Sequence, residues 1–415
     1  MFSDELLNIA DEADAALADI FRGFERTSRE CTEKVLAAFS HFRVSEAHFA
    51  SSTGYGYDDR GRDDLDGIYA EVFGSEAALV RAQIVNGTQA LAVGLFGLLR
   101  PGDTLLSVTG KPYDTLEEVI GISGNAGDGS LADFGIKYRQ IDMTEGGEVD
   151  FDAIDKCLRD DKSVKVVFIQ RSKGYLDKRT LSCADIEKIA SAVHSASDAY
   201  VMVDNCYGEF TETREPTAVG SDLIAGSLIK NPGGGMAATG GYLAGSARAI
   251  ELCSYRLTSV GVGGEVGATL GQNRDMYKGF FYAPHTVAQA LKTAAFAAYV
   301  LEKLGYDVEP RWNEKRYDII QQVKLGGADR LCAFCRGIQF GSPVDSYVTP
   351  EPWEMPGYQD KVIMAAGTFV QGASIELSCD GPLRPPYTAY FQGGLTYESG
   401  RYGVLSAVSE LMKTK

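Results

Sequence analysis

Apolar residues recur every three or four positions across the first 41 residues, and this spacing predicts helices there. From about residue 69 to 245, short apolar runs typical of strands alternate with stretches of helical spacing. The predicted strands are residues 104–109, 135–142, 164–170 and 200–204. Predicted helices cover 87–99, after a strand and glycine turn that begin at residue 84, and 186–197. Strands that alternate with helices favour a mostly parallel sheet with helices on both faces.

The rest of the chain has a different texture. Residues 51–67, SSTGYGYDDRGRDDLDG, have the composition of a long loop, and such loops are often functional. Residues 285–304 are predicted to form a helix with its apolar residues along one face, and this helix is expected to link a large domain to a smaller one. Beyond residue 306 we predict an α+β domain with strands at 335–341 and 373–378 and a final helix from about 402. The expected division is 1–60 for the N-terminal helices and an interface loop, 61–290 for the large domain and 291–415 for the small domain.

Charge and composition exclude several classes of protein. The 40 basic and 57 acidic residues give a net charge of −17, which disfavours binding to nucleic acid or to an anionic membrane surface. No apolar run approaches the roughly 20 residues of a membrane span, and the acidic N-terminus does not resemble a signal peptide. Eight scattered cysteines fit a reducing cytoplasm. Cys332 and Cys335 form a CxxC pair without a second pair or histidine partners, so we expect no metal site.

The segment 200–245 contains the most informative residues. Asp204 ends an apolar strand, and ligands of α/β proteins bind at that edge of the sheet. Lys230 stands between an apolar stretch and the glycines 233–235, which would let the backbone pass close to a planar ligand, and a partly buried lysine is a candidate Schiff-base amine. Each residue alone also fits a structural role. Together with Ser227, they suit pyridoxal phosphate: the lysine for the aldehyde, the aspartate for the ring nitrogen and the serine for the phosphate.

Two further features fit the same cofactor. Gly87 and Thr88 open a predicted helix, whose N-terminal amides attract a phosphate. Tyr113 follows a predicted strand, where an aromatic ring could stack on a pyridine ring, although an ordinary turn tyrosine is an equal reading. The glycines of 259–271 lack the spacing of a dinucleotide-binding fingerprint, and the chain has no phosphate-binding P-loop motif.

These residues resemble the fold-type I pyridoxal phosphate enzymes of the cystathionine/methionine γ-lyase superfamily. More narrowly, the chain is similar to the bacterial branch known as methionine γ-lyase family or aluminium-resistance proteins. The resemblance rests on HFASSTGYGYDDRGRDDLDGIYAEVFGSEAALVRAQIVNGTQA, LRPGDTLLSVTGKPYDTLEEVIG, VMVDNCYGEF, GSLIKNPGGGMAATGGYLAG and PYTAYFQGGLTYESGRYGV, spread over about 48–403. It implies a large domain with a mostly parallel, seven-stranded type of sheet and a smaller α+β C-terminal domain.

The resemblance also implies roles for individual residues. Lys230, Asp204 and Tyr113 match the catalytic lysine, the pyridine partner and the ring-stacking tyrosine, and Ser227 matches a phosphate ligand. A tyrosine and an arginine from a neighbouring subunit reach the phosphate in the superfamily. Tyr55 or Tyr57 with Arg60 fit that pair, and Arg384, with Arg401 as second choice, fits the arginine that binds the substrate carboxylate. The implied assembly is a homotetramer built from dimers with shared active sites.

The expected function is a cytoplasmic carbon–sulfur lyase that acts on a small sulfur-containing amino acid. It would release a thiol, ammonia and a 2-oxo acid by β- or γ-elimination. The sequence leaves the substrate, the choice between β and γ, and any connection with aluminium undecided. Another pyridoxal phosphate reaction, such as transamination, aldol cleavage or racemisation, would use the same lysine and aspartate. A non-catalytic protein with this fold is a further alternative, since fold alone does not determine function.

Overall fold

The computed structural model describes residues 2–175, 178–355 and 358–414, and these form two compact units. The large-sheet unit comprises residues Glu33–Leu228 and Ala237–Lys278. The small-sheet unit comprises the chain up to Thr32, the segment Ile229–Met236 and the chain from Gly279 onward. The N-terminal helices predicted from the apolar spacing are confirmed as α1 (Asp4–Ala16) and α2 (Ala18–His41).

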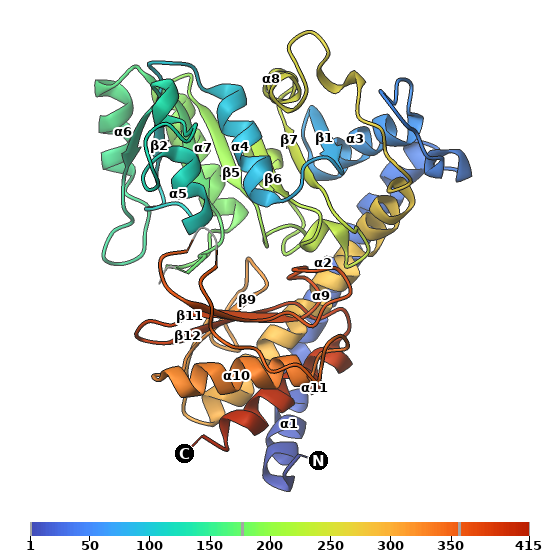
Figure 1. Ribbon diagram of the computed structural model, residues 1–415, viewed down its shortest axis with the longest axis vertical. Coiled ribbons are helices and arrows are strands. Elements are labelled where there is room, and N and C mark those ends of the chain that lie inside the picture. The colour runs from blue at the N-terminus through green and yellow to red at the C-terminus, as the bar shows by residue number, and fades with distance from the viewer. Residues whose placement is uncertain (1, 176–177, 356–357, 415) are drawn as a thin grey trace. The chain divides into compact units, whose positions relative to one another are not determined.

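The large-sheet unit contains a seven-stranded sheet in the order β1-β7-β6-β5-β4-β2-β3 (Figure 1). Strand β7 runs antiparallel to both of its neighbours, and the strands from β6 to β3 are all parallel, which confirms the predicted mostly parallel sheet. The strands are β1 (Ala77–Arg81), β2 (Thr104–Ser107), β3 (Lys137–Gln140), β4 (Val164–Gln170), β5 (Tyr200–Asp204), β6 (Leu223–Ser227) and β7 (Gly241–Gly245).

Helices α4 and α8 pack against this sheet in one apolar core with residues of β2, β4, β5, β6 and β7. Gly94 lets α4 approach the sheet closely, because a Cβ atom there would meet the Met202 Cε atom at 2.6 Å. The helices of this unit are α3 (Arg60–Phe73), α4 (Gly87–Leu98), α5 (Asp114–Ile120), α6 (Phe151–Asp160), α7 (Cys183–Ala196) and α8 (Ala247–Leu257). Short 3-10 turns cover Glu46–Phe49, Ala132–Phe134, Pro216–Val219 and Gly263–Glu265.

Two predictions in this unit are wrong. The loop expected over 51–67 ends at Asp59, because the Asp59 side chain accepts a hydrogen bond from the Arg62 amide at 3.0 Å and starts helix α3. The strand expected from residue 84 is absent from the described structure there. The strand lies earlier, at β1, and the chain between Arg81 and α4 forms a turn.

The small-sheet unit contains an antiparallel five-stranded sheet in the order β10-β11-β12-β9-β8, with helices α10 and α11 packed together beside it (Figure 1). Its strands are β8 (Asp307–Glu309), β9 (Ile320–Lys324), β10 (Val362–Ala365), β11 (Ser378–Pro382) and β12 (Thr388–Gln392). Its remaining helices are α10 (Ala328–Phe340) and α11 (Tyr397–Leu411). Helix α9 (Asn273–Lys303) contributes residues to both units and begins twelve residues before the predicted start at 285.

Two predicted strands of the small-sheet unit are wrong. Residues 335–340 belong to helix α10, which Gly341 caps, and the buried side chains Leu331, Phe334, Cys335 and Ile338 follow a helical spacing. Residues 373–377 form turns, and the strand begins at Ser378.

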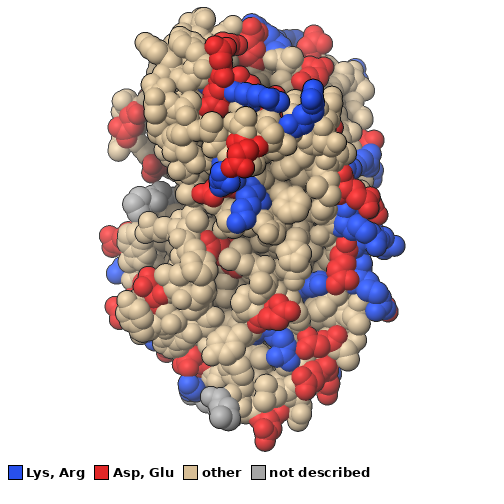
Figure 2. Space-filling model, turned by 90° about the vertical axis from the view of Figure 1, so that its right-hand side faces the viewer, with Lys and Arg blue, Asp and Glu red and all other residues tan. Residues whose placement is uncertain are grey.

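The face drawn in Figure 2 shows Lys and Arg side chains scattered among Asp and Glu side chains, without a continuous basic area. Among the helices of the described residues, none combines the length and apolar character that crossing a membrane requires.

Candidate active site

The carboxyl ends of three parallel strands define the candidate site in the large-sheet unit. Gln170, Asp204 and Ser227 are the last residues of β4, β5 and β6. Gln170 pairs with Asp204 in the sheet, and the Arg171 amide donates to the Asp204 carbonyl at 3.2 Å. Ligands of open α/β sheets bind outside this edge, so the structure places two sequence-predicted residues, Asp204 and Ser227, where a ligand is expected.

The N-terminus of helix α4 lies against the same edge. A Cβ atom at Gly87 would meet the Cys206 Sγ atom at 3.3 Å and the Ser227 Cβ atom at 3.4 Å. Asn86 caps the helix by accepting the Gln89 amide at 2.8 Å. The amides of Gly87 and Thr88 have no hydrogen-bond acceptor within the described residues. A glycine at this point therefore brings two available N–H groups and the positive end of a helix next to the Ser227 hydroxyl.

The carboxylate of Asp204 is buried and held by the turn that follows β5. Its Oδ1 atom accepts the Cys206 amide at 3.1 Å. Behind this turn, the buried Arg171 donates from Nη1 to the Asn205 Oδ1 atom at 2.7 Å, and Asn205 donates from Nδ2 to Glu215 at 3.0 Å. This buried network fixes the backbone that follows Asp204, so its side chain stays at the edge of the sheet.

Tyr113 follows β2, as predicted, and is the half-buried residue directly before helix α5. Its ring packs edge-on against Tyr175 with a centroid distance of 5.7 Å. The hydroxyls of Thr88 and Thr115 form a hydrogen bond at 2.9 Å and join the beginnings of α4 and α5. The structure thus brings the first turns of α4 and α5 together, with Tyr113 at the start of the second.

Lys178 is a residue of this edge that sequence reasoning missed. Its Nζ atom donates to the Thr109 carbonyl at 3.2 Å and to the Gln170 carbonyl at 3.4 Å. Burial lowers the pKa of Lys178 to about 8, and the Asp204 carboxylate partly opposes this effect by favouring the charged amine. Lys178 is not part of a recognisable motif, so the sequence alone did not indicate that it lies at this edge of the sheet.

Lys230 follows β6 by three residues and belongs to the small-sheet unit. It precedes the 3-10 turn Asn231–Gly233. The glycines after Lys230 were predicted to let the backbone pass close to a planar ligand. In the structure, the backbone at Gly234 lies close to helix α9. A Cβ atom at Gly234 would meet the Gly279 carbonyl oxygen at 2.3 Å, so a side chain at Gly234 would push this segment away from α9.

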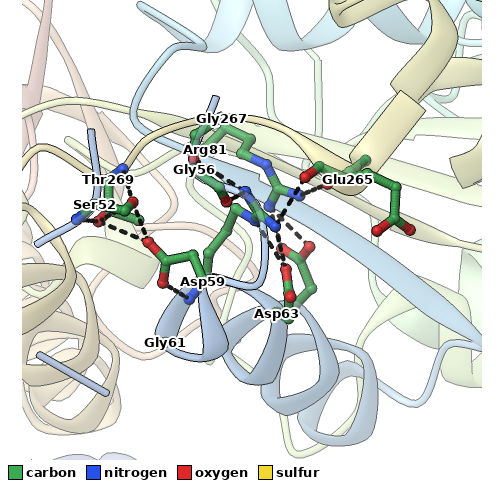
Figure 3. A network of polar contacts seen from close by, with 12 residues as sticks. Ser52, Gly56, Asp59, Gly61, Asp63, Arg81, Glu265, Gly267 and Thr269 are labelled. Atoms are coloured by element: carbon green, nitrogen blue, oxygen red, sulfur yellow. Dashed lines mark hydrogen bonds and ion pairs between the residues drawn. The ribbon is translucent and has the colours of Figure 1, made fainter. Parts of the chain in front are cut away.

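Residues 51–59 form a loop that is fixed to residues 263–271 by a network of polar contacts (Figure 3). Asp59 accepts hydrogen bonds from Ser52 and from the Thr269 hydroxyl, the latter at 3.0 Å. The buried Arg62 donates to the carbonyls of Gly56 at 2.6 Å and Glu265 at 3.3 Å. Burial acts to raise the pKa of Asp59, but these hydrogen bonds outweigh it and hold the pKa below its usual value. The loop therefore has a defined shape in the single chain.

The three residues expected to reach a partner subunit lie on the outside of this loop. Tyr55 and Tyr57 are 70% and 61% exposed, and their rings stack at 5.3 Å between centroids. Arg60, the first residue of α3, is also exposed and donates from Nε to Asp64 at 3.2 Å. In the part of the chain that the structure describes, these three side chains are exposed, so they are available to a second molecule.

The two arginines proposed for a substrate carboxylate lie in the small-sheet unit. Arg384 follows β11 and donates from Nη1 to Asp360 at 2.8 Å, with both side chains partly exposed. Arg401 lies in α11 and donates to Asp14 at 2.9 Å and to Asp11 at 3.2 Å. Arg401 is thus engaged with two carboxylates of α1, whereas Arg384 has one exposed partner.

A comparison with protein families identifies the relatives of this chain. The model of the family described as "Methionine gamma-lyase" matches residues 6–412. The chain belongs to the methionine γ-lyase family. An uncharacterized protein of Bacillus subtilis (strain 168), YnbB, is 53% identical over 409 residues, which cover 98% of this chain and 97% of YnbB. The resemblance predicted from the motifs is therefore confirmed.

Solved structures of related proteins place the fold of this methionine γ-lyase family member. A carbon–sulfur lyase involved in aluminium resistance from Clostridium novyi NT is 52% identical, with a TM-score of 0.95 over 98% of this chain and 96% of that one. The pyridoxal 5'-phosphate dependent protein YhfS from Escherichia coli is 14% identical, with a TM-score of 0.65 over 94% of this chain and 97% of that one. The second likeness concerns the fold alone, and it confirms the predicted fold class.

Proposed function

We propose that this protein is a pyridoxal phosphate-dependent carbon–sulfur lyase that acts on small sulfur-containing amino acids. The observation that carries the proposal is the close approach of Gly87 to Ser227 and Cys206, which brings a helix N-terminus to the sheet edge that bears Asp204. This edge offers amide and hydroxyl donors for a phosphate and a buried carboxylate for a pyridinium. Membership of the methionine γ-lyase family and the similarity to a carbon–sulfur lyase support the same assignment.

The described residues fit this cofactor chemically. The amides of Gly87 and Thr88 and the hydroxyl of Ser227 would hold the phosphate, and Tyr113 would stack on the ring. The Asp204 carboxylate would hold the proton of the ring nitrogen. When bound, pyridoxal phosphate supplies an electron-accepting ring that stabilises negative charge at the substrate Cα atom. The Gly87 position supports this fit, because a side chain there would crowd Ser227 and Cys206.

The chain's own residues would then carry the proton transfers and the binding of substrate. The Lys230 amine would hold the cofactor covalently before the substrate arrives, and would afterwards take the proton from the substrate Cα atom. Arg384 would bind the substrate carboxylate through two parallel N–H groups after leaving Asp360. Loss of the thiol from Cβ or Cγ would give, after hydrolysis, ammonia and a 2-oxo acid.

A substrate panel tests the proposed function. The purified protein with pyridoxal phosphate is incubated with methionine, homocysteine, cysteine and cystathionine, and thiol, ammonia and 2-oxo acid are measured together. Equal release of 2-oxo acid and ammonia with a sulfur product is expected for at least one of them, and the carbon number of the 2-oxo acid distinguishes β- from γ-elimination. Transfer of the amino group to an added 2-oxo acid without loss of sulfur would instead indicate an aminotransferase.

Arg60→Ala is expected to weaken cofactor binding by about tenfold or more, because it removes a charged hydrogen-bond donor to the phosphate. Covalent attachment at Lys230 should persist at saturating cofactor. The measurement is the dissociation constant by absorbance titration, with Arg248→Ala as the control, since Arg248 is an exposed arginine that pairs with Glu251 on α8.

Subunit mixing decides whether Arg60 acts across an interface. If each site takes Arg60 from one subunit and Lys230 from the other, a heterodimer of Arg60→Ala and Lys230→Ala chains contains one intact site. At a cofactor concentration too low to load the Arg60→Ala sites, random mixing should then restore about a quarter of the wild-type activity. Activity that stays at the level of the unmixed variants would place Arg60 in its own subunit's site or outside the site.

Arg384→Lys is expected to raise the KM for the amino acid without changing the absorbance of the bound cofactor. A lysine offers a point charge in place of the planar pair of donors that matches a carboxylate. Steady-state kinetics on Arg384→Lys and Arg401→Lys, measured side by side, check the assignment. A higher KM in the Arg401 variant alone would transfer the role to Arg401.

A further inference from the structure

Lys178 is a partly buried cation at the candidate site to which the proposed function gives no role. It comes from the segment between β4 and α7, and its ammonium group lies over the ends of two neighbouring strands. It donates to the carbonyl of Thr109, just after β2, and to the carbonyl of Gln170, the last residue of β4. Both acceptors are uncharged, so they orient the ammonium group without neutralising it.

The next strand end in the sheet carries Asp204. Gln170 pairs with Asp204 across β4 and β5, and the Gln170 amide is itself fixed by the Thr109 hydroxyl at 3.0 Å. The Thr109–Gln170 pair therefore anchors Lys178 one strand away from the carboxylate. Asp204 is the charged group that acts on Lys178 within the described residues, and its effect favours the protonated amine. A pKa of about 8 leaves Lys178 mostly charged at pH 7.

We propose that Lys178 is a positioning residue that holds the Asp204 carboxylate in its charged form for the ring nitrogen of the cofactor. The inference rests on the proposed function, because Asp204 is taken there as the partner of that nitrogen. Asp204 is buried, and burial in a protein penalises a charged carboxylate. A cation fixed one strand away offsets that penalty. The carbonyls of Thr109 and Gln170 accept two of the three ammonium protons and so fix the position of the cation.

The first test concerns the two side chains alone. The protonation of Asp204 is followed by carbon-13 NMR in the protein without added cofactor, and the signal is assigned with Asp204→Asn. In Lys178→Met the titration midpoint of Asp204 is expected to rise by about one pH unit, because the variant removes a cation that favours the charged carboxylate. Lys178→Arg should keep it near the wild-type value. An unchanged midpoint in Lys178→Met would overturn the inference whether or not the protein binds the cofactor.

The second test asks whether Lys178 acts through the ring nitrogen. Dissociation constants are measured for pyridoxal phosphate and for the analogue in which carbon replaces the ring nitrogen. Lys178→Met should weaken binding of pyridoxal phosphate by about tenfold and leave binding of the analogue nearly unchanged. An equal loss for both ligands would overturn the inference, because Lys178 would then contact another part of the cofactor or support the fold.

Lys162→Met provides the matched control. Lys162 also donates to a backbone carbonyl, that of Leu158 at 2.9 Å, but it precedes β4 and lies at the opposite end of that strand. It should change neither the titration of Asp204 nor either dissociation constant. A wild-type protein that binds no pyridoxal phosphate would refute the proposed function, and the titration of Asp204 would still decide the role of Lys178.

Discussion

Replacing Lys230 by alanine is expected to abolish both covalent attachment of pyridoxal phosphate and turnover. The physical reason is that one amine would serve as the covalent anchor and as the base that removes the Cα proton, so no second group takes over either task. Visible absorbance, and mass mapping of the borohydride-reduced protein, measure the attachment. Turnover is measured with the best sulfur amino acid of the panel.

Two further variants make the Lys230 result specific. Lys230→Arg keeps the positive charge but lacks a nucleophilic amine, so it should be as inactive as Lys230→Ala. Lys162→Ala, a lysine at the far end of β4, should behave as wild type. A Lys230→Ala protein that retained its visible absorbance and its turnover would refute the assignment.

Asp204→Ala is expected to lower turnover by about two orders of magnitude. A hydrogen bond to a charged group contributes about 1.5–3 kcal/mol, and its loss would also leave the ring a weaker electron acceptor. The measurement is kcat at saturating cofactor, together with the absorbance spectrum of the bound cofactor.

Asp222→Asn is the control for Asp204, because Asp222 accepts the Val201 amide at 2.7 Å near the opposite end of β5. It should leave the spectrum unchanged. Wild-type turnover in Asp204→Ala would mean that another group holds the ring nitrogen.

The buried parallel strands could be predicted because their sequences carry one unambiguous signal. Strands β4 and β5 match the predicted residues 164–170 and 200–204, since most side chains in them are buried and apolar. Residues 335–341 misled the prediction because a short window of CRGIQFG alternates apolar and polar residues as a strand does. Only the longer window from Leu331 shows the helical spacing that buries one face of α10.

The candidate site was predictable only where a strand or helix boundary marks it. Asp204, Ser227 and Gly87 stand at such boundaries, so their place at one sheet edge follows from the parallel topology. Lys178 lies in a polar segment without periodicity. Its place at the sheet edge depends on hydrogen bonds to the carbonyls of Thr109 and Gln170, which are distant in sequence. The roles of Lys230, Arg384 and Arg401 stay predictions that the kinetic experiments above address.

The loop 51–59 also bears on how two copies of this chain would recognise one another in the proposed assembly. The residues that shape the loop, Asp59 and Arg62, face inward, whereas Tyr55 and Tyr57 face outward. The contacts that fix the loop are made with Glu265 and Thr269, some two hundred residues away in sequence. The loop and the segment 263–271 therefore form one structural unit, and we expect them to change together among related sequences. A chimera that exchanges both segments should keep its fold and change its choice of partner. Exchange of residues 51–59 alone would disrupt the contacts with 263–271 that give the loop its shape.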